Sequence, residues 1–209
     1  MQTGSEQGHL SEGADSPRTA VLVLVAVLSV VLAACGGSSE SEGGAQATPQ
    51  PKPLAPSTAG LPAKLAANVK DADTIVGDGA DAFRDRLGEL RGHPVVVNQW
   101  ASWCDNCRFE FPFFRSAATR YRDRVAFLGL DAQDDRGDAE RFLQELPFGI
   151  PSVFDPDASV SALLGGGTSW PTTFFIDEKG EVVNVKIGAY ANEELLNRDI
   201  EQFALGKRG

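Results

Sequence analysis

Cys104 and Cys107, three residues apart, are the residues of this sequence best suited to chemistry. An apolar stretch at residues 95–100 and a short loop lead into them, which predicts a buried strand ending at Trp100 and a helix that Cys104 opens. At the start of a helix, unpaired backbone N–H groups and the helix dipole favour negative charge. We therefore expect a lowered pKa for the Cys104 thiol, which populates the attacking thiolate.

Cys107 follows Cys104 by one helical turn, on the same face of the predicted helix. At that spacing its sulfur can attack the mixed disulfide that Cys104 would form with a substrate. The pair is thus expected to form a reversible disulfide in which Cys104 attacks first and Cys107 resolves. With Cys35 the chain has three cysteines, too few for a disulfide-stapled scaffold, so Cys35 needs a separate explanation.

Short apolar and β-branched segments predict the strands that position this pair, at residues 94–99, 125–130, 172–176 and 181–187, with 73–76 as a further candidate. Helices are expected at residues 80–90, 104–122, 137–145, 158–164 and 192–204. Strands and helices alternate until the last two strands, which a polar turn ending in Gly180 joins as an antiparallel hairpin. The sequence therefore predicts an α/β domain with a mixed central sheet and helices on both faces.

Three motifs, in one order within residues 71–204, resemble the thioredoxin superfamily and, more closely, its TlpA/ResA-like thiol-disulfide oxidoreductases. The motifs are Trp-Ala-Ser-Trp-Cys-x-x-Cys at 100–107, Glu-Phe-Pro at 110–112 and Trp-Pro-Thr-Thr-Phe-Phe-Ile-Asp at 170–177. A lone CxxC would be weak evidence, whereas this combination is specific. The resemblance implies a thioredoxin fold in which Cys104 is the exposed nucleophile and Cys107 resolves.

The same resemblance implies roles for residues around the pair. Pro171 would be a cis-proline beside the cysteines, the Trp170 backbone would pair with an extended substrate segment, and Trp103 would flank the pair. Glu110 stands where this branch carries an acidic residue, three positions after Cys107, and could accept or return the resolving thiol's proton. The competing interpretation of Glu110 is a solvated helix glutamate.

Two features depart from the pattern of the relatives: the dipeptide between the cysteines and the residue at position 98. Asp105 and Asn106 lie between the cysteines, where many relatives have proline in the second place; an acidic residue there disfavours the Cys104 thiolate and should make the pair less oxidising. Asn98 stands where cytoplasmic thioredoxins carry a buried aspartate, so that proton relay is absent. The direction of electron flow stays open, because related pairs span roughly −270 to −120 mV.

An apolar run at residues 20–34, with Ser29 as its single polar residue, is too short for a spanning helix and fits a signal peptide. Its end, Leu32-Ala33-Ala34-Cys35, resembles the lipobox of bacterial lipoproteins, which implies that a lipid on Cys35 anchors the chain at the extracytoplasmic face of the cell membrane. An uncleaved signal anchor would orient the domain identically. The residues before the run are acidic, so the leader is atypical or translation starts downstream of Met1.

These signals divide the chain into a signal peptide at 1–34, the lipidated Cys35 with a flexible Gly/Ser/Pro-rich tether at 35–70, and a thioredoxin-like domain at 71–209. The net charge of −10 excludes nucleic acid as an expected partner, because the surface should repel phosphate backbones. The membrane is expected to be reached through the lipid anchor.

The function indicated is a membrane-tethered thiol-disulfide oxidoreductase that exchanges electrons with protein thiol or disulfide substrates and with a membrane electron donor or acceptor. It would serve cytochrome c maturation or envelope disulfide reduction; the alternatives are a disulfide-forming oxidase of secreted proteins and a copper-chaperone-like metal carrier. A carrier needs a third ligand, usually histidine, and the sequence offers only His9 and His93. A structural disulfide and a peroxidase fit the motifs less well.

No metal and no small-molecule cofactor are implied, since the glycines at 165–167 precede no phosphate-binding helix.

Overall fold

The computed structural model describes residues 57–207. The predicted signal peptide, Cys35 and most of the predicted tether lie outside these residues. Between residues 57 and 207 no helix is both long and apolar enough to cross a bilayer.

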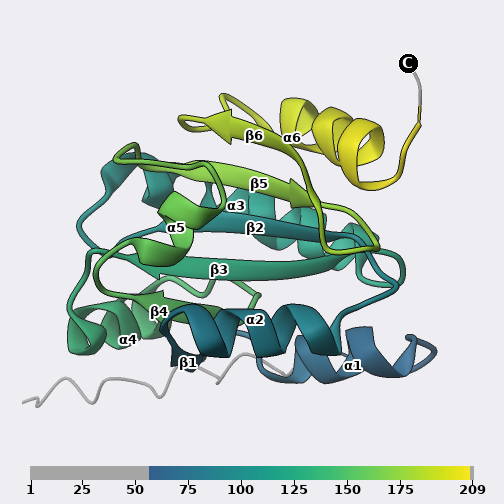
Figure 1. Ribbon diagram of the computed structural model, residues 1–209, viewed down its shortest axis with the longest axis horizontal. Helices are drawn as coiled ribbons and strands as arrows, with labels where there is room; N and C mark the ends of the chain where they lie inside the picture. The colour runs from purple at the N-terminus through teal and green to yellow at the C-terminus, as the bar shows by residue number, and fades with distance from the viewer. Residues whose placement is uncertain (1–56, 208–209) are drawn as a thin grey trace, which may run out of the picture. The chain divides into compact units, whose positions relative to one another are not determined.

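Six strands form one mixed sheet in this part of the chain, in the order β1-β4-β3-β2-β5-β6 (Figure 1). The strands are β1 Ile75–Asp78, β2 Val95–Trp100, β3 Ala126–Ala132, β4 Ser152–Asp155, β5 Thr172–Ile176 and β6 Val182–Ile187. The first four in the sheet run parallel to their neighbours, and β5 runs antiparallel to both β2 and β6. The predicted mixed sheet with an antiparallel C-terminal hairpin is confirmed.

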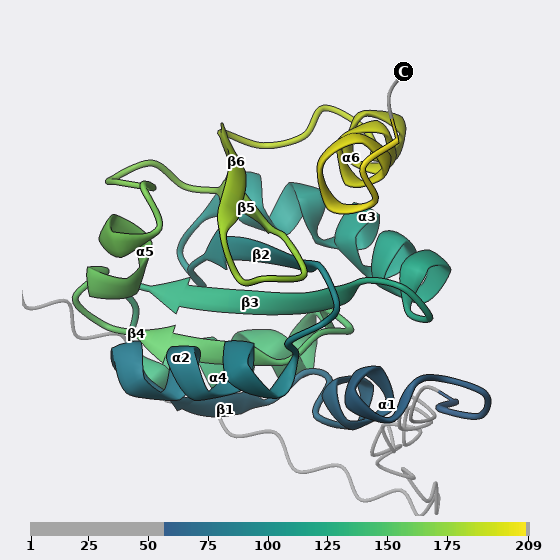
Figure 2. The ribbon, with the colours of Figure 1, turned by 45° about the vertical axis from the view of Figure 1, so that its right-hand side comes forward.

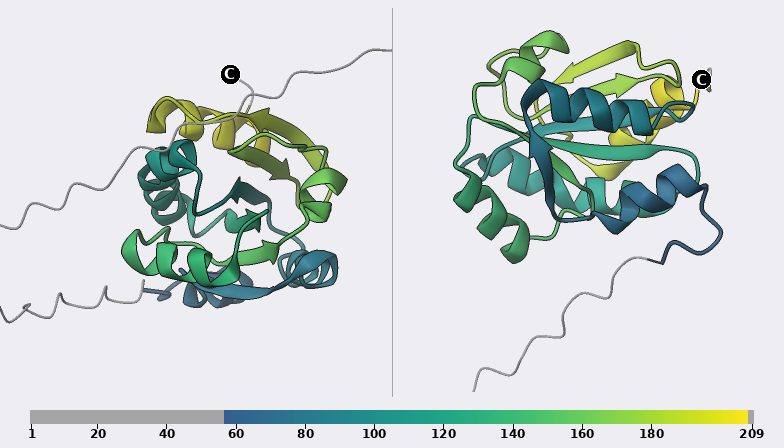
Figure 3. Two further views of the ribbon diagram at one scale, coloured as in Figure 1. Left: turned by 90° about the vertical axis from the view of Figure 1, so that its left-hand side faces the viewer. Right: turned by 60° about the horizontal axis from the view of Figure 1, so that its bottom comes forward.

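Helices cover both faces of the sheet (Figures 2 and 3). On one face, α3 Asp105–Tyr121, α4 Arg136–Glu145 and α6 Glu193–Asp199 contribute buried residues to one hydrophobic core, and α6 continues into a π-helical stretch at Ile200–Ala204. On the other face, α1 Ala63–Lys70, α2 Gly79–Glu89 and α5 Ser159–Leu163 contribute to a second core. Every residue of β2, β3 and β5 is buried between these layers, which explains their nearly continuous apolar sequences.

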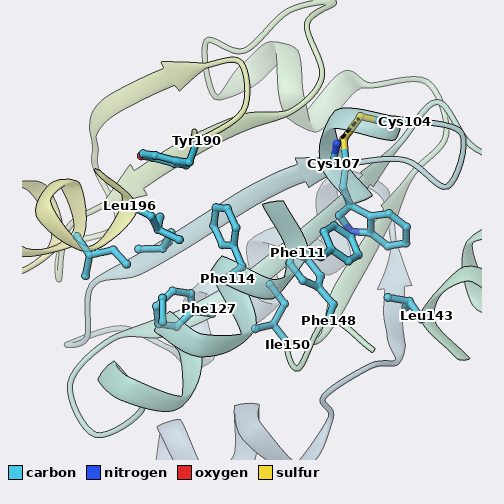
Figure 4. Packing of buried hydrophobic residues seen from close by; sticks show 14 of the residues in the cluster. Cys104, Cys107, Phe111, Phe114, Phe127, Leu143, Phe148, Ile150, Tyr190 and Leu196 are labelled. Atoms are coloured by element: carbon cyan, nitrogen blue, oxygen red, sulfur yellow. Dashed lines mark hydrogen bonds between the residues drawn. A yellow bond between two sulfur atoms is a disulfide. The ribbon is translucent and has the colours of Figure 1, made fainter. Parts of the chain in front are cut away.

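Aromatic rings fill the core beneath the cysteine pair (Figure 4). Phe111 stacks on Phe148 with ring centroids 3.7 Å apart, and Trp100 packs edge-on against Phe111 and stacks on Phe142. Trp100 and Phe111 belong to the two elements that flank the Cys104 loop, β2 and α3. The cluster therefore fixes the position of α3, which carries the cysteines, relative to strand β2.

The folded domain begins earlier than the boundary predicted at residue 71. Helix α1 lies within the segment assigned to the tether, yet Leu65 is buried in the second core and Asn68 Nδ2 donates a hydrogen bond of 2.8 Å to the Phe127 carbonyl. Strand β4 was also missed, because half of its residues, Ser152 and Asp155, are polar although buried. A four-residue strand of that composition carries no clear hydrophobic signal.

Candidate active site

Cys104 is the N-cap residue of α3, and the backbone N–H of Cys107 donates to Cys104 Sγ at 3.1 Å. The two sulfurs are joined in a disulfide with an S–S distance of 2.05 Å. Figure 4 shows this disulfide at one end of the aromatic cluster that contains Phe111. The helix start and the N–H donor that would stabilise a Cys104 thiolate after reduction are therefore in place.

The two cysteines differ in access to solvent, although less than the sequence suggested. Cys104, expected to be exposed, keeps 6% of its surface accessible, and Cys107 keeps none. In the disulfide state a partner can therefore approach the pair only from the side of Cys104. That asymmetry fits the order of attack expected from the sequence.

Two tryptophans lie together next to the pair. Trp103 is 55% exposed, and its ring centroid lies 5.4 Å from that of Trp170. The Trp170–Pro171 peptide bond is cis. Thr172 Oγ1 donates a hydrogen bond of 2.8 Å to the Ser169 carbonyl, which holds the preceding loop. The structure thus brings Trp103 together with Trp170 and Pro171, which lie more than sixty residues later in the sequence.

Glu110 is fully buried, so the interpretation as a solvated helix glutamate is wrong. Its two oxygens accept one bond each, from Asn98 Nδ2 at 2.8 Å and from the Tyr190 N–H at 2.8 Å. Burial raises the pKa of Glu110 to about 7, although these two bonds and the charge of Lys186 act to lower it. A carboxyl with this pKa exchanges protons readily near neutral pH.

Sequence reasoning missed three contributors to this environment. Asn98, noted only as a lost aspartate, is a hydrogen-bond donor to Glu110. Tyr190 and Lys186 come from the C-terminal part of the chain. Lys186 Nζ donates a hydrogen bond of 2.6 Å to the Ala189 carbonyl, and it lies 4.4 Å from the centre of the Tyr190 ring. No local sequence signal links them to a helix some eighty residues earlier.

The loop between β2 and α3 is held by a second carboxylate that the sequence did not single out. Asp134 accepts hydrogen bonds from the backbone N–H and the hydroxyl of Ser102, the latter at 2.8 Å. Trp103 Nε1 donates 2.9 Å to the Gln133 carbonyl in the same segment. Residues 133–134 therefore anchor the loop that leads into Cys104.

No group of three or more histidine, cysteine or acidic side chains within residues 57–207 is placed to hold a metal ion. His93, the histidine considered for a metal carrier, belongs to this described part.

Residues 72–185 match the AhpC/TSA family. The chain belongs to this family. Among its curated relatives, the thiol-disulfide oxidoreductase ResA of Bacillus thuringiensis is 28% identical over 127 residues, covering 60% of this chain and 73% of the relative. The thiol:disulfide interchange protein DsbE of Pseudomonas fluorescens is 34% identical over 113 residues, covering 53% and 60%.

Solved structures agree with this assignment. A putative thiol:disulfide interchange protein DsbE from Chlorobium tepidum is 31% identical with a TM-score of 0.51, covering 55% of this chain and 82% of its own. MTB DsbF, solved in mixed oxidized and reduced forms, is 30% identical with a TM-score of 0.50, covering 55% and 83%. With the Cys104–Cys107 disulfide, these relatives identify this member of the family as a thiol-disulfide oxidoreductase of the ResA/DsbE type.

Proposed function

We propose that the Cys104–Cys107 pair reduces disulfides of protein substrates outside the cytoplasm, while a lipid on Cys35 holds the chain at the membrane. The observation that carries the redox part is the disulfide at the start of α3, with a buried carboxyl, Glu110, one helical turn beyond the inner cysteine. The anchor is supported by the lipobox-like Leu-Ala-Ala-Cys sequence, which lies outside the described residues.

The reaction runs as two thiol-disulfide exchanges. The Cys104 thiolate of the reduced pair attacks a substrate disulfide, forms a mixed disulfide and releases the first substrate sulfur, which takes up a proton. Cys107 then loses its proton, attacks Cys104 Sγ and releases the second substrate sulfur as a thiol. The pair ends as the disulfide seen here, and the substrate has gained two electrons and two protons.

Glu110 is the proposed acceptor of the Cys107 proton in the second exchange. It follows Cys107 by one turn of α3 and shares the same buried side of the helix. Its pKa of about 7 lets it take the proton in its carboxylate form and return it during re-reduction. Asn98 and Tyr190 hold both carboxylate oxygens in place during these transfers.

The charges around the pair support electron donation to substrates. Asp105 occupies the first turn of α3, next to Cys104, and the buried Glu110 lies one turn beyond Cys107. Negative charge near a thiolate raises its energy, which destabilises the reduced pair relative to the disulfide. A pair whose reduced form is less stable is a stronger reductant.

Apocytochrome c is the substrate that suits this chemistry best. Covalent haem attachment uses the two cysteines of a C-x-x-C-H segment, and both must be free thiols. Outside the cytoplasm such neighbouring cysteines tend to oxidise. A tethered reductant, recharged by a membrane electron donor, would keep them reduced, and other envelope disulfides of similar exposure would be reduced in the same way.

Equilibration of the purified domain with glutathione buffers tests the direction of electron flow. We expect a potential nearer to about −270 mV, as in thioredoxin, than to about −120 mV, as in DsbA. The matched variant Asp105→Asn should be less reducing, because a charge that opposes the Cys104 thiolate is gone. A potential near the DsbA value would instead establish a disulfide-forming oxidase.

Mixed-disulfide trapping tests the roles of the two cysteines. Cys107→Ala should accumulate substrates on Cys104, and Cys104→Ala should accumulate almost none, because Cys107 is inaccessible. Trapping through Cys107 would reverse the assignment.

Fractionation of Cys35→Ser cells tests the anchor. Loss of the protein from the membrane pool, with loss of lipid labelling, is the expected result. An unlabelled wild-type protein and an unchanged membrane pool would show an uncleaved signal anchor instead.

A further inference from the structure

Asp131 is a buried carboxyl group that the exchange reaction described above does not use. It lies near the end of β3, in register with Trp100 of β2 and Phe154 of β4. None of its surface is exposed, and neither of its oxygens has a hydrogen-bond partner among residues 57–207 when it is treated as a carboxylate. A buried charge without a partner is too costly to persist, so this side chain must be protonated and must find an acceptor.

The acceptor is Asp134, which binds Ser102, two residues after Trp100, the strand partner of Asp131. The charge of Asp134 and its side-chain hydrogen bond both act to raise the pKa of Asp131. The other acidic neighbour, Asp155 at the end of β4, already accepts the N–H groups of Val160 and Ser161 at the start of α5. Burial and the two acidic neighbours raise the pKa of Asp131 to about 9. Two carboxyl groups that are joined by a hydrogen bond do not both ionise near neutral pH, so they share one proton.

Basic residues of α3 and α4 do not neutralise this pair within residues 57–207. Arg108 of α3 lies over the Phe142 ring, 4.3 Å from its centre, and Arg136 of α4 pairs with Asp78 and Glu140. No ion pair reaches Asp131 or Asp134 from either helix within residues 57–207. The shared proton, rather than a cation, therefore holds the two carboxyl groups together.

The hydrogen bonds of Asp134 place that proton on Asp131. Asp134 accepts from the Ser102 N–H, from Ser102 Oγ at 2.8 Å and from the Asp135 N–H at 2.8 Å, and a carboxylate suits three donors. Ser102 lies two residues before Cys104, and the Cys104 N–H closes the same loop by donating 3.1 Å to the Ala101 carbonyl. The orientation of Asp134 thus sets the position of the loop from which Cys104 projects.

We propose that Asp131 is a positioning residue for disulfide exchange: its protonated carboxyl donates to Asp134 and so holds the Ser102 loop, which aims Cys104 at the substrate. The expected effect of Asp131 on disulfide exchange rests on the proposed function. The expected effect of Asp131 on the Ser102 loop does not. When Asp131 ionises in alkaline solution, the two carboxylates repel and the loop is released.

The Ser102 amide resonance of the oxidised full-length protein reports the loop directly, because the disulfide cysteines do not titrate. From about pH 6 to about pH 9.5 we expect this resonance to titrate in the wild type and to stay at its hydrogen-bonded position in Asp131→Asn, whose amide can still donate to Asp134. Asp131→Leu should show the released position at all pH values. Asp85→Asn, an exposed aspartate of α2, is the matched control and should titrate like the wild type.

Reduction of a protein disulfide at neutral pH by the reduced variants gives the second readout. We expect Asp131→Leu to react about tenfold more slowly than Asp131→Asn. A Ser102 resonance that is independent of pH in the wild type, or is unchanged in Asp131→Leu, would overturn the inference. If Asp131→Leu does not fold, Asp131→Ala takes its place, because it too lacks a donor to Asp134, and it must likewise release Ser102. A titrating Ser102 in a protein that reduces no protein disulfide would leave the loop inference standing and reject the proposed function.

Discussion

Replacing Glu110 by glutamine should change how the stability of the oxidised protein depends on pH. Burial raises the pKa of Glu110 from 4.5 to about 7 in the folded state, whereas an unfolded chain keeps the ordinary value. Unfolding therefore releases a proton between these two values. The contribution of the Glu110 carboxyl to stability is fully present below about pH 4.5 and is lost as the pH rises through about 7.

The size of the effect follows from the same two pKa values. At about 1.36 kcal/mol per pKa unit, the difference amounts to about 3 kcal/mol. Glutamine cannot ionise, so the stability of Glu110→Gln relative to the wild type should rise by about 3 kcal/mol from about pH 4 to about pH 8. The glutamine can accept from only one of Asn98 and Tyr190, which adds an offset that is the same at every pH.

Urea unfolding of both oxidised proteins at intervals across this range measures the difference. Glu145→Gln is the matched control, because Glu145 is exposed at the end of α4 and should show no such trend. Asp131 is present in all three proteins, so its own titration cancels. If the difference in stability between the wild type and Glu110→Gln stayed constant across the range, the Glu110 carboxyl would not be desolvated. The proposed role of Glu110 in proton transfer would then lose its basis.

Two further substitutions test the packing that positions the pair. Phe148→Ala should cost about 3–5 kcal/mol in urea unfolding, because it removes a fully buried ring stacked on Phe111; a loss below about 1 kcal/mol would contradict this view of the core. Gly129→Ala should cost about 1–3 kcal/mol, because its Cβ would lie 2.1 Å from Ser152 Oγ and 2.8 Å from Trp100 Nε1. The double variant with Ser152→Ala should recover part of that loss, and equal stability of Gly129→Ala and the wild type would refute the clash.

Most of the fold could be predicted from local pattern. Strand β5 was predicted at its observed bounds, 172–176, because five apolar or β-branched residues lie between a proline and a polar turn. Helix α1 could not be recognised, because only Leu65 and Asn68 of its eight residues are buried, and it follows a segment rich in proline and small residues. It packs on β3, more than fifty residues later, and a local pattern does not reveal that contact.

The candidate site was predictable only where its residues lie close together in the sequence. Cys104 and Cys107 are marked by their spacing and by the strand before them. The burial of Glu110 depends on Tyr190, eighty residues away, and the loop contact of Asp134 depends on its distance from Ser102 in the folded chain. A helix position alone does not tell how deeply a carboxyl lies, so the choice between a proton acceptor and a surface glutamate required the structure.

Helix α1 and the disulfide lie at opposite ends of the sheet. This helix bonds to Phe127, at the beginning of β3, whereas the loop that carries Cys104 follows the end of the parallel neighbour β2. The two sites are therefore separated by the length of the sheet, about 20 Å for a strand of this size. The described part of the chain thus enters the domain at the end of the sheet opposite the disulfide. A tether that joins the domain at this end leaves the length of the sheet between its point of attachment and the pair.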